Sequence, residues 1–198
     1  MCRFVESIQL KEGQFKHIEL HQLRLQKAMA DFYPNEKVIN LAESLNQSSF
    51  SHEGLFKCRV VYDSEIRQIE FIPYIRREIK SLRLIETDIE SRFYKLENRS
   101  EFVAAFGLRG NCDDVLLVKN GLLTDTSYCN IALSDGENWY TPRIPLLYGV
   151  NRAKLIADGK LKEKDIKQTE FVNFQNISLF NAMIDFKDII LKTSIISL

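Results

Sequence analysis

The sequence has no excess of charge of either sign. Lys and Arg together number 27, as do Asp and Glu, so the formal net charge of the 198 residues is zero at pH 7. The one basic cluster, Arg76-Arg77 with Lys80, includes the acidic Glu78. A chain without net charge lacks the field that holds a phosphodiester backbone or an anionic lipid surface. We therefore expect neither nucleic acid nor a membrane as a partner.

Long apolar runs are also missing. No stretch approaches the ~20 apolar residues that span a bilayer. The opening segment MCRFVESIQL lacks the charged n-region and the long apolar core of a signal peptide. We therefore expect a cytoplasmic protein.

Cysteine and histidine are few and scattered. The cysteines form no C-x-x-C pair, and in a reducing compartment such thiols are usually single and buried or idle. His17, His21 and His52 are too few and too differently placed to suggest a metal cluster. The sequence therefore predicts neither a zinc site nor a disulfide framework. The cysteines are Cys2, Cys58, Cys112 and Cys129.

General catalytic motifs are absent. The chain contains no G-x-x-x-x-G-K-[ST], G-x-G-x-x-G, H-E-x-x-H or G-x-S-x-G segment. Several polar residues stand at the expected ends of elements, where caps, turns and solvated positions are the ordinary interpretation. They are Arg24, Lys95, Asp125, Asn151 and Asn181.

The chain has enough apolar residues, 45%, to bury a substantial core. In its first part, alternating apolar residues predict strands and a 3.6-residue period predicts helices. We expect an α+β unit whose helices cover one face of a largely antiparallel sheet. Its expected strands are 2–10, 15–20, 54–63 and 67–74, with a hairpin turn at 12–14, and its expected helices are 19–33 and 35–47.

The second part is richer in turns. Asn120-Gly121 and Asp135-Gly136 favour the positive φ angles of two-residue hairpin turns, and strand-like residues flank both pairs. We expect a β-meander, a short helix between Gly149 and Gly159, and two final strands within 177–195. The predicted organisation is two domains: an α+β N-terminal domain at 1–78 and a barrel-like β domain at 79–198.

The order of several segments resembles the class IV aminotransferases. The resemblance covers nearly the whole chain, and the K-x-x-N-R form of KLENR looks most like the aminodeoxychorismate lyases of that group. The segments, in chain order, are FVESI, HQLRLQKA, KLENR, GLLTDTSYCNIAL, TP, LLYGVNR and LFNAMID.

The resemblance implies fold type IV and pyridoxal 5′-phosphate (PLP) as the cofactor. Family members hold PLP covalently on a lysine, and Lys95 stands at that place in the C-terminal domain. An ε-amine suits this role because it forms an imine with the cofactor aldehyde and, once displaced by a substrate amine, becomes a base beside the α-proton. The family's Thr-Glu pair, which holds the pyridine nitrogen, corresponds to Thr124-Asp125. Asp125 keeps the charge but is one methylene shorter.

The resemblance also assigns a phosphate site. Arg24 corresponds to the family arginine that binds the phosphate, and we expect it on an exposed helix face, where its planar fork suits a dianion. Gly149-Val150-Asn151 corresponds to the helix start whose free N–H groups accept the same anion, with Asn151 in place of the usual threonine. Asn181-Ala182 corresponds to the loop over the phosphate and the substrate carboxylate.

The substrate side departs from the family. The chain starts almost on FVES, and the loop after its R-V-x-Y segment is reduced to DSE. If the hairpin docks as in relatives, Val5 and Ser7 would line the site, and Arg59 or Tyr62 could meet a carboxylate. In such strands alternate residues more often simply face the core.

Three functions remain open at this point. The first is an aminodeoxychorismate lyase that forms an imine with its substrate, removes the α-proton and releases pyruvate and p-aminobenzoate. The second is a class IV aminotransferase acting on a branched-chain or D-amino acid. The third is a shortened, non-catalytic relative with a binding role. For either enzyme we expect a small-molecule amino substrate and a homodimer, since fold type IV sites take walls from a neighbouring subunit.

Overall fold

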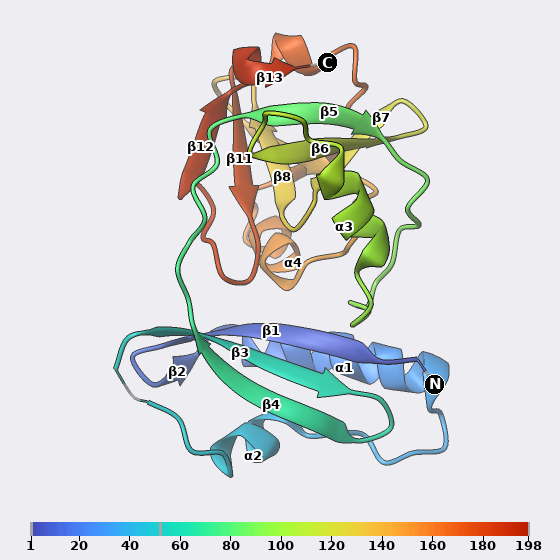
Figure 1. The fold of residues 1–198 in the computed structure, drawn as a ribbon, viewed down its shortest axis with the longest axis vertical. Coiled ribbons are helices and arrows are strands. Elements are labelled where there is room, and N and C mark those ends of the chain that lie inside the picture. The colour runs from blue at the N-terminus through green and yellow to red at the C-terminus, as the bar shows by residue number, and fades with distance from the viewer. Residues whose placement is uncertain (1, 52, 198) are drawn as a thin grey trace. The chain divides into compact units, whose positions relative to one another are not determined.

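The computed structural model describes residues 2–51 and 53–197, and contacts divide the chain into two compact units (Figure 1). Unit 1 contains Met1–Ile75 and Phe93–Asn98, and unit 2 contains Arg76–Arg92 and Arg99–Leu198. The segment that carries Lys95 therefore groups with unit 1 by its contacts, whereas the sequence pattern assigned it to the C-terminal part.

Unit 1 is an antiparallel sheet with helices on one face. Within the described residues the strands lie in the order β2-β1-β3-β4, and the long pairs β1–β3 and β3–β4 form most of the sheet (Figure 1). Successive residues of a strand point to opposite faces, so each long strand gives every second side chain to the helices. The elements are β1 Phe4–Lys11, β2 Gln14–Phe15, α1 Ile18–Phe32, α2 Leu41–Asn46, β3 Leu55–Tyr62 and β4 Ile66–Pro73.

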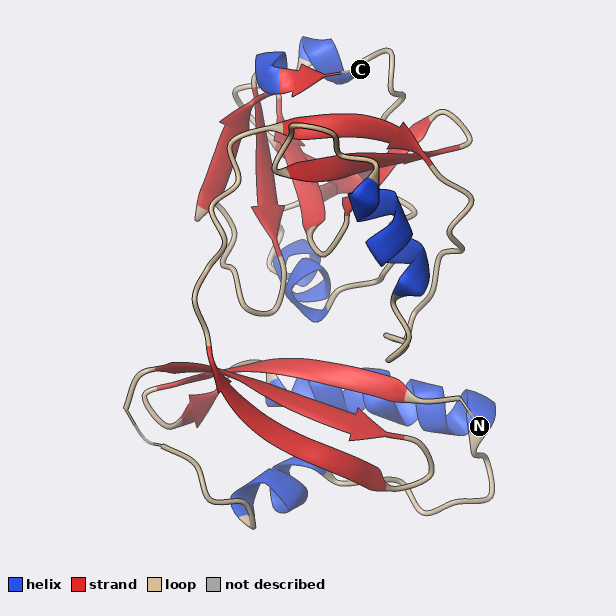
Figure 2. Ribbon diagram, viewed as in Figure 1, coloured by secondary structure: helices blue, strands red, loops and turns tan. Residues whose placement is uncertain are grey.

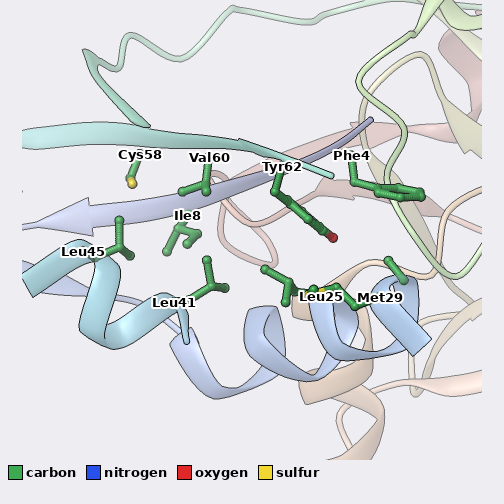
Figure 3. Packing of buried hydrophobic residues seen from close by; sticks show 10 residues of the cluster. Phe4, Ile8, Leu25, Met29, Leu41, Leu45, Cys58, Val60 and Tyr62 are labelled. Carbon is green, nitrogen blue, oxygen red and sulfur yellow. The ribbon is translucent and has the colours of Figure 1, made fainter. Parts of the chain in front are cut away.

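The core of unit 1 lies between this sheet and its two helices (Figure 3). Alternate residues of β1 and β3 meet one stripe of α1 and the inner side of α2, which is the pattern of an amphipathic helix on a half-buried sheet. The most buried members are Phe4, Ile8, Leu25, Ala28, Met29, Leu41, Leu45, Cys58, Val60 and Tyr62.

Two expected boundaries in unit 1 are wrong. The second strand of the hairpin is only Gln14–Phe15, because His17 adopts a left-handed conformation (φ 54°) and the helix begins at the next residue. The expected helix 35–47 begins only at Leu41. The side chain of Asn40 accepts a hydrogen bond from the backbone N–H of Glu43, which caps the helix at that point.

Unit 2 is built mainly of strands (Figure 2). Within the described residues nine strands form a mixed sheet in the order β10-β9-β8-β7-β6-β5-β13, and β11 joins β8 to β12. The expected meander is confirmed, since β6, β7, β8 and β9 pair antiparallel in chain order. The strands are β5 Leu82–Glu86, β6 Asp114–Lys119, β7 Leu122–Thr126, β8 Asn130–Ser134, β9 Trp139–Pro142, β10 Lys162–Lys164, β11 Asn176–Phe180, β12 Ile189–Lys192 and β13 Ile196–Ser197.

The Asn120-Gly121 turn has the predicted chemistry. Both residues have positive φ, 51° and 74°, as the two central residues of a type I′ hairpin require. The expected final strands are present as the antiparallel pair β11–β12. The helical elements of unit 2 are α3 Ser100–Gly107, α4 Val150–Ala157 and the 3₁₀ turns η1 Phe171–Asn173 and η2 Thr193–Ile195.

Unit 2 has small apolar clusters under its helices. Phe102 and Ala105 of α3 pack on Val115 and Leu117 of β6. Leu155 of α4 packs with residues of β8 and β11 in a second cluster. The second cluster thus joins α4 to β8, the strand that begins at Asn130.

None of the helices in the part of the chain that the structure describes is long and apolar enough to cross a membrane. Over the same residues no group of three or more His, Cys, Asp or Glu side chains could hold a metal ion. His52, one of the three histidines considered in the sequence, lies outside the described residues.

Candidate active site

Lys95 lies in a short segment that pairs with the free edge of β1. The backbone N–H of Val5 donates to the carbonyl of Lys95 at 2.9 Å, and the backbone N–H of Glu97 donates to the carbonyl of Arg3 at 2.9 Å. This edge is open because β2 pairs only with the far end of β1. The Lys95 segment thus satisfies backbone groups of an otherwise bare strand edge.

The Lys95 ammonium contacts Ser7 on the sheet face opposite the helices. Its Nζ donates to Ser7 Oγ at 2.9 Å. Phe4 and Ile8 face the helices in the core, so the alternate residues Val5 and Ser7 lie on the other face. The structure therefore brings Lys95, Val5 and Ser7 together, and the expectation that Val5 and Ser7 line a substrate site stays a prediction.

Arg24 is held by Glu6, a residue that the sequence analysis did not single out. Arg24 Nε donates to Glu6 Oε1 at 2.8 Å, and Arg24 Nη2 donates to Glu6 Oε2 at 2.5 Å. The Arg24 side chain is only 9% exposed, so the expectation of an exposed helix face is wrong. Glu6 occupies an inward-facing position of β1 and pairs with the guanidinium at the sheet–helix interface. Arg24 Nη1 makes no hydrogen bond to any residue that the structure describes, so its two N–H groups remain for an anion, and the phosphate role stays a prediction.

His21 completes this buried cluster. Its Nδ1 lies 2.5 Å from Glu6 Oε2 and must carry the hydrogen, because an ionised carboxylate only accepts. Burial raises the pKa of Glu6, but Arg24 and His21 outweigh burial and lower it to about 2. Burial also lowers the pKa of His21, so the imidazole is neutral at pH 7. The cluster therefore holds one negative and one positive charge in fixed orientation.

The structure does not support the substrate role of Tyr62. Its side chain is fully buried in the core of unit 1 and packs against Phe4, with ring centroids 5.6 Å apart (Figure 3). Tyr62 pairs with Phe4 in the sheet register and so faces the helices, away from Ser7. A substrate arriving from solvent cannot reach a side chain enclosed in this way.

Arg59 lies on the same face as Ser7 but is already paired. Its Nη1 donates to Glu70 at 3.0 Å, and its Nη2 donates to Glu97 at 3.0 Å. Ser7 and Arg59 are directly opposite in the β1–β3 register, so their side chains share a face. A substrate carboxylate would have to displace two protein carboxylates from this guanidinium.

Asp125 is a buried carboxylate fixed by two donors at the end of β7. Asn130 Nδ2 donates to Oδ1 at 2.8 Å, and the backbone N–H of Leu147 donates to Oδ2 at 2.9 Å. Burial raises the pKa of Asp125 from 3.8 to about 6, and the two donors limit the rise. A carboxylate has about four acceptor positions. Asp125 can therefore accept a further N–H donor.

The start of α4 is shaped by a close contact between Gly149 and Asn130. A Cβ built on Gly149 would lie 2.0 Å from Asn130 Oδ1, so only glycine fits there. Because Gly149 has no side chain to cap the helix, the first N–H groups of α4, from Val150 onward, are not capped by a side chain. Asn130 thus fixes both Asp125 and the helix start, although the sequence analysis did not single it out.

Asn151 and Asn181 are brought together, but in a different way from that expected. Asn151 Nδ2 donates to the carbonyl of Asn181 at 2.9 Å and to that of Ile184 at 3.4 Å, so its side chain holds a turn rather than an anion. Asn181 Oδ1 accepts from the backbone N–H groups of Met183 and Ile184 at 2.7 and 3.0 Å. The half-buried Ala182 lies in this turn. The amide of Asn151, which stands where the family has a threonine, is therefore not available to an anion, and only the main chain remains available there.

Comparison with known proteins places this geometry in a family. The sequence model for amino-transferase class IV matches residues 103–189. An uncharacterized protein from Haemophilus influenzae is 33% identical over 185 residues, which cover 92% of this chain and 98% of that protein. The chain belongs to the class IV aminotransferase family.

Two solved structures share the fold of this chain. A protein from Haemophilus somnus 129pt, described as a "putative 4-amino-4-deoxychorismate lyase", is 27% identical, with a TM-score of 0.86 over 93% of this chain and 97% of that chain. A hypothetical aminotransferase from Mycobacterium tuberculosis in its PLP-bound form is 14% identical, with a TM-score of 0.76 over 93% of this chain and 78% of that chain. The predicted fold, α+β of fold type IV, is confirmed.

Proposed function

We propose that the chain is a PLP-dependent enzyme that removes a proton from an amino substrate, and that its reaction is the release of pyruvate and p-aminobenzoate from 4-amino-4-deoxychorismate. The observation that carries the proposal is Lys95, whose Nζ lies 2.9 Å from the hydroxyl of Ser7. An amine held by a hydroxyl in this way is placed to bind an aldehyde and to carry a proton.

PLP is the cofactor of this family, and it was expected from the sequence. The residues present fit it. Asp125 has acceptor positions left for the pyridine N–H, because its two oxygens receive one hydrogen bond each. Each unit offers a feature that by itself suits a phosphate: Nη1 of Arg24 in unit 1, and the N–H groups at the start of α4 in unit 2. When bound, PLP supplies an electron sink for a carbanion at the substrate carbon.

Three residues of the chain would then act in turn. Lys95 Nζ would hold the cofactor and, with substrate bound, would take a proton from the substrate carbon. Ser7 Oγ accepts a hydrogen bond from Nζ and keeps it in one position. Asp125 would accept a hydrogen bond from the pyridine N–H, and its buried negative charge would stabilise that proton more strongly than it would in water.

The lyase reaction is favoured over amino transfer for two reasons. The similarity to the Haemophilus somnus protein extends over almost the whole length of both chains. A lyase also needs no second binding mode for a keto-acid acceptor, which suits a chain with a reduced substrate loop. Amino transfer to a keto acid remains the alternative, and both reactions begin with the same proton removal at Lys95.

The experiment that tests this proposal measures pyruvate. Purified protein is loaded with PLP and given 4-amino-4-deoxychorismate without any keto acid, and pyruvate and p-aminobenzoate are followed over time. Equal amounts of both products, and none from Lys95→Ala, are the expected result. Amino-group transfer to an added keto acid, without pyruvate release, would show that the protein is an aminotransferase and not a lyase. A PLP-loaded wild type with neither activity would favour the non-catalytic alternative.

We also propose that the protein is a cytoplasmic homodimer. Fold type IV sites take walls from a neighbouring subunit, and closed two-fold pairs are the commonest soluble assemblies. Light scattering should give twice the chain mass of 23.1 kDa at working concentration. A monomer that retains full activity would refute the shared-site part of the proposal.

A further inference from the structure

The bridge between Arg59 and Glu97 crosses β1 and reaches the Lys95 segment. Arg59 belongs to β3 and lies opposite Ser7 in the register, while Glu97 lies beyond the other edge of β1. The guanidinium therefore spans β1 on the face where Nζ of Lys95 meets Ser7. The Arg59 and Glu97 side chains are 26% and 29% exposed, so the pair is mostly shielded from water.

Glu97 stands two residues after Lys95, and the backbone between them is tied to β1. The Lys95 carbonyl accepts from Val5, and the Glu97 N–H donates to Arg3. These two bonds fix the segment along the strand edge, and Tyr94 and Leu96 pack against the core of unit 1 on the helix side. Arg59 adds an anchor on the opposite face of the sheet, because it holds Glu97 from β3.

We infer that Glu97 and Arg59 are positioning residues that hold the Lys95 Nζ in the orientation in which it meets Ser7 and accepts the cofactor aldehyde. The inference rests on the proposed function, because it assigns the bridge to cofactor capture at Lys95. It also gives a role to the contact between Arg59 and Glu97. The bridge acts through Lys95 and touches neither cofactor nor substrate.

The chain contains a matched control for this bridge. Glu70 binds the same guanidinium at the same distance, 3.0 Å, but it lies on β4, on the side away from Lys95. Glu70→Gln removes one of the two carboxylates from Arg59 and leaves the Lys95 segment anchored. Glu97→Gln removes a carboxylate of the same charge and, with it, the ion pair that holds the Lys95 segment on that face.

The test measures how fast PLP attaches to Lys95 in the protein without substrate. Purified protein free of cofactor is mixed with PLP, samples are reduced with borohydride at intervals, and mass spectrometry of the digest gives the labelled fraction of Lys95. The exposed Lys11 at the far end of β1 serves as the internal reference. A partly shielded ion pair is worth up to about 1 kcal/mol, so Glu97→Gln should slow labelling of Lys95 by about threefold to fivefold.

The remaining variants decide the interpretation. Glu70→Gln should label Lys95 at the wild-type rate within a factor of about two, and labelling of Lys11 should not change in any variant. Arg59→Gln should slow labelling as Glu97→Gln does, and the double variant should be no slower than either single one, because the two changes break the same bridge.

Two failures can be told apart. If wild-type Lys95 is not labelled at all, the proposed function is wrong. If wild-type Lys95 is labelled and Glu97→Gln matches its rate, only the positioning inference is wrong. An Arg59→Gln variant that labels normally but shows a raised KM for substrate would return Arg59 to the carboxylate-binding role and would also overturn the inference.

Discussion

Replacing Asp125 by asparagine should change how the stability of the cofactor-free protein depends on pH. The carboxyl group is 3% exposed, and burial raises its pKa from 3.8 to about 6. An acid whose pKa is higher in the folded state is harder to ionise there than in the unfolded chain. Its charge therefore opposes folding wherever it is ionised.

The size and sign of this effect follow from the two pKa values. Below pH 3.8 the group is protonated in both states and costs nothing. Between 3.8 and 6 the unfolded chain loses its proton first, so unfolding becomes easier as pH rises, and above 6 the full cost is present. The difference of about 2.2 pKa units corresponds to about 3 kcal/mol at 1.36 kcal/mol per unit. The asparagine variant cannot ionise at this position, so the cost of the buried charge is absent from it at every pH.

The variant also has a cost that does not depend on pH. Asparagine offers one acceptor oxygen, whereas Asn130 and the backbone N–H of Leu147 both donate to Asp125. One donor is left without its acceptor, at a cost of about 1–3 kcal/mol. Therefore only the change with pH of the difference in unfolding free energy between the two proteins measures the cost of the buried charge.

Urea unfolding of both proteins between pH 4 and 7.5 measures this slope. The unfolding free energy of wild type minus that of Asp125→Asn should fall by about 2.4 kcal/mol between pH 4 and 7.5, most of it below pH 6.5, because a small part of the full cost of about 3 kcal/mol is already present at pH 4. Asp88→Asn, the same change at an exposed aspartate, is measured alongside as the comparison. A flat difference for Asp125→Asn, or one that rises with pH, would refute the buried-charge account of this residue.

Two further substitutions test the anion site. Arg24→Lys keeps the charge but loses the planar fork that Glu6 now holds. The PLP affinity should therefore fall about tenfold to a hundredfold in a spectroscopic titration. If the variant binds PLP with the wild-type affinity, Arg24 does not bind the phosphate. Gly149→Ala would place a Cβ 2.0 Å from Asn130 Oδ1, so it should weaken PLP binding and lower the thermal unfolding temperature together; an alanine variant with unchanged affinity and stability would show that Asn130 can move freely.

The order of elements could be predicted because it depends on local patterns. The alternation in β1 and β3, the helical period in α1 and the Asn120-Gly121 turn each identify their element without tertiary information. The start of α2 could not be placed in the same way. Residues 35–40 are compatible with a helix, and only the hydrogen bond from Glu43 to Asn40 decides where the helix begins.

The site was predicted in part for a related reason. Lys95, Asp125 and the start of α4 were identified because several segments resembled a family in the same order. Glu6 was missed, although a signal was present: it stands between Phe4 and Ile8 at an inward-facing position of a strand, where a charge requires a partner. The environment of Arg24 follows from that pairing, which joins residues 18 positions apart in the sequence.

Tyr62 and Asn151 show what resemblance cannot supply. Both residue types suit the roles first assigned to them, but the direction of a side chain depends on its face of the strand and on the carbonyl groups nearby. Tyr62 faces the helices of unit 1, and the side-chain amide of Asn151 donates its hydrogen bonds to the carbonyls of Asn181 and Ile184. Neither fact can be derived from the type of residue alone.

The most direct test of the whole account is whether PLP becomes covalently attached to Lys95. The visible absorption spectrum of the PLP-loaded protein is recorded before and after borohydride reduction, and the labelled peptide is identified by mass spectrometry. The account predicts a visible band that reduction abolishes and a stable PLP adduct on Lys95, while Lys95→Ala binds PLP without any adduct. An adduct on another lysine, or full activity in Lys95→Ala, would contradict it.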